Sequence, residues 1–286
     1  MINYNPKEWV TIIFRIQKED TFRKLLPLML AVSVYAGLVT YLELDVFKLT
    51  QNSQVKNLSL MHSILGFVIS LLLVFRTNTA YDRWWEGRRH WGALTNTSRS
   101  LAIKLHAFLT EPADRKFFEL MIPNYAFALK NHLRENEDYH EIDPVLDLHK
   151  EKHIPNQIAS GIYSQLFKLQ QEQKLTENQL LILNQEIIAF TDICGACERI
   201  KNTPIPFSYS IFIKKFIFFF VMTLPFGWAF SLGYYIIPVV VFILYAFASL
   251  ELIAEEIENP FGTDANDLPL DSICKNIKKH IKEILD

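Results

Sequence analysis

Long runs of apolar residues divide the chain into regions of different character. Two runs near its start carry no formally charged side chain. As helices rising about 1.5 Å per residue, each would reach roughly 27 Å, close to the hydrocarbon thickness of a bilayer. A third apolar region, residues 216–250, is too long for one crossing, and Gly233 marks its middle. The pattern predicts four membrane-spanning helices, at residues 25–42, 58–75, 216–232 and 234–250.

The second span is expected to continue as one long helix. Side chains beyond it recur at alternating steps of three and four, the spacing of one helix face. No proline interrupts the pattern before Pro112. The face consists of Trp91, Leu94, Ser98, Leu101, Leu105 and Phe108.

Further helical signals lie between the second and third spans. Helices fit residues 114–134 and 158–171, and the capping box Thr176-Glu-Asn-Gln179 starts another helix that should reach Ile200. Since no segment shows convincing strand alternation, we predict an all-α membrane protein. The expected regions are an N-terminal segment (1–24), the first two spans (25–75), a helical region (76–215), the last two spans (216–250) and a C-terminal segment (251–286).

Basic residues predict the orientation in the membrane. They cluster before the first span and after the second, whereas the loop between these spans carries only Lys48 and Lys56. The positive-inside rule places both termini and the middle region in the cytoplasm of a multi-pass protein of the cell (inner) membrane. The clusters are Arg15, Lys18, Arg23 and Lys24, and Arg76, Arg83, Arg88 and Arg89.

Composition and motifs exclude several function classes. The net charge is −2, which argues against a nucleic-acid partner. The Arg- and Trp-rich residues 75–92 begin at a membrane boundary, so we interpret them as an interface segment. Because the sequence contains no phosphate-binding loop, dinucleotide fingerprint or nucleophile elbow, we expect no enzymatic activity.

Two short motifs could hold a metal ion, and we favour the simpler interpretation of each. Cys194 and Cys197 form a CxxC motif without a second pair or a nearby histidine in the sequence, so we expect buried thiols. With Cys274 they make an odd number, which fits a reducing compartment. His149 and His153 could share a metal on a helix, but the surrounding charges favour a solvated stretch.

A stripe of small and polar residues on the second span has two interpretations. The residues alone favour close helix packing. The alternative is a water-filled pathway, in which Phe67, Leu71 and Phe75 could form an apolar constriction. The stripe consists of Ser59, Ser63, Gly66 and Ser70.

Three segments carry a family resemblance. Residues 75–92 read FRTNTAYDRWWEGRRHWG, residues 197–206 read CERIKNTPIP, and residues 257–262 read IENPFG. Together they resemble the bacterial branch of the bestrophin family, over nearly the whole chain. The resemblance implies a homopentameric ion channel, with the second span lining a narrow neck and the middle region enclosing a wider vestibule. It also suggests that Arg76, Asn78 and Tyr81 bind neighbouring helices or subunits.

The resemblance implies particular pore residues. Alignment on the tryptophan-rich motif places the neck at Phe67, Leu71 and Phe75, which are apolar as the family expects. A second alignment gives Ser59, Ser63 and Phe67, and we prefer the first because its motif is longer. A second aperture is expected at Leu180 or Leu181.

Calcium binding and ion selectivity stay open. The resemblance implies that Asp264, Asp267 and the backbone of Asn259 match calcium-binding positions of animal members. Two carboxylates supply few of the six to eight oxygens that calcium takes, and they could instead cap a helix near Leu270. We expect no required cofactor. Members of the family conduct chloride or cations, and an uncharged neck does not choose between them.

We therefore expect a pentameric channel for small monovalent ions that contacts membrane lipid and binds no nucleic acid. A membrane-anchored scaffold or binding protein without conduction is the alternative. A secondary transporter would need inverted repeats and buried titratable groups, for which His62 is the one candidate in the spans.

Overall fold

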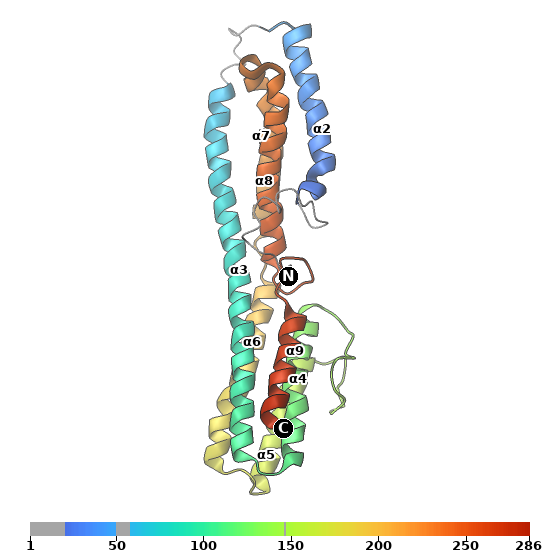
Figure 1. Cartoon of the computed structure of the whole chain (residues 1–286). Coiled ribbons are helices and arrows are strands. Elements are labelled where there is room, and N and C mark those ends of the chain that lie inside the picture. The colour runs from blue at the N-terminus through green and yellow to red at the C-terminus, as the bar shows by residue number, and fades with distance from the viewer. Residues whose placement is uncertain (1–20, 50–57, 146) are drawn as a thin grey trace. The chain divides into compact units, whose positions relative to one another are not determined.

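The structure is a computed structural model of the 286-residue chain, and it describes residues 21–49, 58–145 and 147–286 (Figure 1). Every regular element in these residues is helical, which confirms the all-α prediction. Most of the predicted N-terminal segment, with Arg15 and Lys18, lies outside the described residues, and so does Lys56.

The chain divides into two compact units. The membrane unit comprises residues 21–82 and 204–258 of the described chain, and the bundle unit comprises residues 83–203 and 259–286. Helix α3 (Leu58–Phe108) contributes to both as one element of 51 residues. The second span therefore does continue as a single helix, as the proline-free sequence predicted.

Four helices form the membrane unit: α2 (Thr21–Tyr41), the first part of α3, α7 (Phe207–Leu232) and α8 (Ile236–Glu258). A π-helical turn, η1 (Leu42–Val46), follows α2, and a 3-10 turn, η3 (Gly233–Tyr235), separates α7 from α8. Gly233 has a φ of +54°, a conformation that glycine adopts at little cost, and it ends α7 at the predicted break. The core of the unit includes Ala36, Ile69, Leu73, Ile213, Ile236 and Val240.

Four stretches of the described chain are long and apolar enough to cross a membrane. Three contain the predicted spans: Thr21–Val46, Leu58–Phe108, and Phe207–Glu258, which holds both α7 and α8. The fourth is α6 (Glu177–Asn202), which we did not predict as a span. We assign α6 to the bundle unit, because one side of it lies in the core of that unit.

The bundle unit contains the rest of α3 together with α4 (Pro112–Leu133), α5 (Ile154–Gln171), α6 and α9 (Leu270–Leu285). Helix α4 is central, since it packs against α5, α6 and α9 and is buried almost continuously over its second half. In Figure 1, α9 lies alongside α4. The predicted face of α3 enters this core, with Trp91, Leu94, Ser98, Leu101 and Leu105 all fully buried.

Helix starts follow local capping signals. Thr176 and Gln179 form the predicted capping box of α6. Helix α5 begins at Ile154 rather than at residue 158, because His153 caps it by accepting the Asn156 backbone N–H. Helix α7 begins after Pro206 instead of at residue 216.

Candidate functional site

One side of α3 in the membrane unit is exposed, and it carries the predicted neck residues. The side chains of Phe67, Leu71 and Phe75 are 70%, 45% and 56% exposed, whereas Ile69 and Leu73 are buried on the opposite side. Residues four apart on a helix differ by only about 40° in direction, so the three form a continuous apolar stripe. Ser63 is exposed one step before it.

The polar residues of the same span divide between two environments. The hydroxyls of Ser63 and Ser70 are exposed and donate hydrogen bonds to the carbonyls four residues back, at 3.1 and 2.7 Å. Ser59 is half-buried. His62 is buried, with Nε2 3.0 Å from the hydroxyl of Thr223 on α7. The alternative neck register thus contains a half-buried residue, and His62 is used in packing α3 to α7.

Arg76 is a buried cation of the membrane unit, with 1% of its side chain exposed. Its guanidinium lies 2.7 Å from a carboxylate oxygen of Glu258 and 3.5 Å from one of Glu251, both on α8. The second oxygen of Glu258 accepts the backbone N–H of Ile205 at 2.6 Å. As expected, Arg76 binds neighbouring helices: it connects α3 with the end of α8.

Arg83 binds the C-terminus of α6 within the bundle unit. Its two Nη atoms donate to the carbonyls of Ile200 and Thr203, each at 2.5 Å. The last carbonyls of a helix lack intrahelical partners, and a cation satisfies both their hydrogen bonds and the negative end of the helix dipole. The first two signature segments therefore contact each other through this residue.

The loop after α8, which holds most of the third signature segment, also packs on α3. The indole N–H of Trp84 donates to the carbonyl of Asn266 at 2.9 Å. Gly87 faces Pro260 and Phe261 so closely that a Cβ on it would lie 3.0 Å from each ring. Membrane-interface anchoring stays a prediction for Trp84, whose indole also binds the loop after α8.

The loop with the possible calcium ligands uses one of its carboxylates internally. Asp267 is buried, and its Oδ2 accepts the backbone N–H of Asp264 at 2.7 Å. The side chains of Asp264 and Asn259 are exposed. Helix α9 begins after Pro269 without a side-chain cap, so the alternative role of capping that helix is wrong. Two carboxylates, one of them held inside the loop, supply only part of the six to eight oxygens that calcium takes.

The two candidates for the second aperture differ in environment. Leu180 packs partly buried against the core of the bundle unit. Leu181, the next residue of α6, is 70% exposed. Of the two, Leu181 has a side chain available to face a pore.

All three thiols of the chain are buried and free. Burial raises the pKa of Cys194 and of Cys274 to about 12 each, and it also raises the pKa of Cys197. The CxxC motif is therefore a pair of protonated core residues, as expected.

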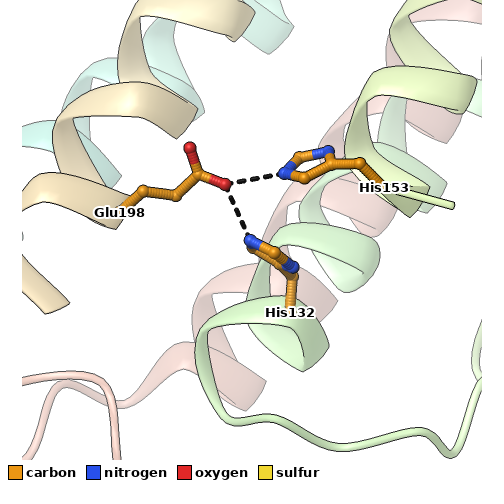
Figure 2. A group of neighbouring side chains, drawn as sticks. All are labelled: His132, His153 and Glu198. Atoms are coloured by element: carbon orange, nitrogen blue, oxygen red, sulfur yellow. Dashed lines mark hydrogen bonds and ion pairs between the residues drawn. The ribbon is translucent and has the colours of Figure 1, made fainter. Parts of the chain in front are cut away.

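The histidine pair suggested by the sequence is not the pair that the structure brings together. His153 faces His132 and Glu198 (Figure 2). His149 is exposed, and its backbone exchanges hydrogen bonds with the side chain of Gln157 and accepts the backbone N–H of Lys152. A solvated stretch was our interpretation, and it is wrong for His153. Local spacing could not reveal these partners, because His132 and Glu198 lie on other helices.

Comparisons with known proteins agree on one family. A family model described as Bacterial/Fungal Bestrophin protein matches residues 1–283. The protein named voltage-dependent anion channel-forming protein sll1024 of Synechocystis is 36% identical over 232 residues, covering 77% of this chain and 75% of that protein. Voltage-dependent anion channel-forming protein YneE of Salmonella typhimurium is 31% identical, covering 100% and 94%.

Solved structures show the same similarity. A crystal structure of a variant of a bacterial bestrophin homolog from Klebsiella pneumoniae aligns with a TM-score of 0.80 and 25% identity, covering 91% of this chain and 98% of that one. A crystal structure described only as a membrane protein variant aligns with a TM-score of 0.83 and 26% identity, over the same shares of the two chains. The curated relatives are named as channel-forming proteins, a non-enzymatic class, in agreement with the sequence.

Proposed function

Because the chain belongs to the bacterial/fungal bestrophin family, we propose that copies of it assemble around one axis into an anion channel whose neck is lined by α3. The carrying observation is the exposed stripe of Phe67, Leu71 and Phe75, opposite the buried side of the same helix. One helix cannot enclose a pore, so the stripe needs copies of itself, and the family resemblance suggests five. The names of the relatives support anions as the conducted ions.

The neck acts through shape and wetting rather than through charge. Rings of phenylalanine and leucine form an apolar constriction that blocks ions when it loses its water. The edge of an aromatic ring carries partial positive charge, so edges of Phe67 and Phe75 turned toward the axis would favour anions. Ser63 supplies a hydroxyl at the entrance to the stripe.

Leu181 forms the second aperture in this proposal. It lies in the first turns of α6, and its 70% exposed side chain has no place in the core of its own chain. Symmetry copies would bring identical leucines together into a second apolar ring. Leu180 supports α6 from the core side.

The proposed channel lies in the cell (inner) membrane, with both termini and the bundle unit on the cytoplasmic side. Arg23 and Lys24 precede the apolar part of α2, and Arg83, Arg88 and Arg89 follow the apolar part of α3. Basic residues at both places favour retention in the cytoplasm. Conduction needs no calcium, since the loop after α8 offers only part of a calcium shell.

The test is a reversal potential in a planar bilayer that contains purified protein and a potassium chloride gradient. We expect a current that reverses near the chloride equilibrium potential, and an altered conductance for Phe67→Ala and Leu71→Ala. Phe242→Ala is the matched control, because Phe242 is 68% exposed on another helix, α8, and should leave conductance unchanged. A protein that gives no current under any ionic condition would contradict the proposal and favour the scaffold alternative. Reversal near the potassium potential would contradict the assigned ion.

A further inference from the structure

Three helices of the bundle unit bring a histidine, a second histidine and a glutamate together. His132 is in the last turn of α4, His153 caps α5, and Glu198 lies near the end of α6 (Figure 2). The Nε2 atoms of His132 and His153 lie 2.7 and 2.6 Å from the same oxygen of Glu198. The imidazole centroids are 4.4 Å apart, and the candidate ligand atoms all lie within 4.8 Å of one another.

We propose that His132, His153 and Glu198 form a zinc-binding site. Two imidazole nitrogens and one carboxylate oxygen are a donor set that zinc takes when it leaves its fourth position to water or another ligand. At bond lengths of about 2.0–2.2 Å, tetrahedral ligands lie about 3.3 Å apart. The two nitrogen–oxygen distances of 2.7 and 2.6 Å would therefore need to lengthen only slightly for zinc to bind. Calcium and magnesium prefer oxygen ligands, so a site with two imidazole ligands favours zinc over either of them.

Hydrogen bonds show how the cluster is held without a metal. The backbone N–H of Asn156 donates to Nδ1 of His153 at 3.2 Å, so the proton of a neutral His153 ring is on Nε2 and points at Glu198. For zinc to bind Nε2 of a neutral ring, this proton would move to Nδ1, so the hydrogen bond from Asn156 would be lost and a metal–nitrogen bond gained.

The site is open to solvent on two sides. His132 and Glu198 line a cavity of about 390 Å³, and His153 lines another of about 730 Å³. The three side chains are each about a third exposed. Lys201, the nearby cation on α6, is paired with Glu135 at 2.9 Å and so opposes metal binding only weakly. An ion can enter from either cavity, and a water molecule can complete its coordination.

Zinc titration of the full chain tests the proposal. Protein without a histidine tag is purified in detergent, stripped with a chelator, and titrated with zinc chloride in competition with a chromophoric chelator. We expect one tight ion per chain, and binding weakened about tenfold or more by His132→Ala, His153→Ala or Glu198→Gln. His149→Ala is the matched control, since His149 lies four residues from His153 but outside the cluster. The zinc affinity of this variant should equal that of the wild type. Cobalt in place of zinc should give the visible absorption of a tetrahedral site in the wild type and not in these three variants.

A second measurement uses the unmodified chain, in case a variant fails to fold. Diethyl pyrocarbonate modifies accessible imidazoles, and mass spectrometry locates the modification. Zinc should protect His132 and His153 and leave His149 reactive. Two results would overturn the zinc site. One is an equal zinc affinity in the wild type and the cluster variants, and the other is a failure of zinc to protect His132 and His153 from modification.

Discussion

Packing of the third signature segment on α3 can be tested with two glycines of one helix. Gly87 and Gly92 both lie inside α3, where alanine is favoured over glycine by about 1 kcal/mol. A Cβ on Gly92 would meet nothing within 4 Å, whereas a Cβ on Gly87 would lie 3.0 Å from Pro260 and from Phe261. Overpacking of this kind costs about 1–3 kcal/mol, and the fully buried Phe261 has little room to move.

The two substitutions should therefore have different effects on stability. Gly92→Ala should stabilise the protein by about 1 kcal/mol, whereas Gly87→Ala should be neutral or destabilise it by up to about 2 kcal/mol. Because roughly 1 kcal/mol shifts the melting temperature by about 2–4 °C in a protein of this size class, tryptophan fluorescence during heating at one fixed scan rate can separate the two.

If Gly87→Ala stabilises the protein as much as Gly92→Ala does, the close approach of Phe261 to α3 is wrong. A double mutant provides a further check. Phe261→Leu makes room for the new methyl group, so it should cost less in the Gly87→Ala background than in the wild type. Purely additive effects would show that the two residues do not touch.

Three other predictions concern charge. Burial raises the pKa of the Asp271 carboxyl, but Lys130 and Arg134 outweigh it and hold that pKa at about 2. Because the folded pKa is depressed, the resulting stability is present above about pH 4 and is lost as the pH falls through about 2. Asp271 is 52% exposed, so we expect Asp271→Asn to cost only about 1 kcal/mol at pH 7, with the difference in melting temperature shrinking between pH 4 and pH 2. Arg76→Met should destabilise the protein by about 3 kcal/mol, since it leaves the buried Glu251 without its cation, and adding Glu251→Gln should recover part of this loss in melting temperature. Calcium chelation should leave the bilayer conductance unchanged, because conduction needs no calcium in the proposed channel. A loss of current on chelation would instead support calcium binding by the loop after α8.

Helices with strong local signals could be predicted from the sequence. The proline-free run of α3 and the capping box of α6 both act through residues close together in the chain. The start of α7 was placed too late, at the first uninterrupted apolar run. The real signal was Pro206, since a helix can start after a proline even where polar residues follow.

Contacts between segments that lie far apart in the sequence could not be predicted from local sequence patterns. His149 and His153 matched a helical spacing, yet Pro155 lies near the start of α5 and leaves His149 outside the helix. Attention to that proline could have excluded the pair. Nothing in the local sequence could have identified Glu198 as the partner, because it follows 45 residues later on another helix. The family motifs likewise gave no hint that Arg83 would cap α6.

The protonated state of the three buried cysteines makes the natural chain suitable for chemical labelling. Thiol reagents attack the thiolate, and a pKa of about 12 lowers its fraction at neutral pH by on the order of a thousandfold relative to an ordinary thiol. A cysteine introduced at an exposed position would therefore react almost alone, without removal of the native ones. Maleimide probes could then follow single positions such as Leu71 or Leu181 in an otherwise unaltered protein and report which of them water reaches.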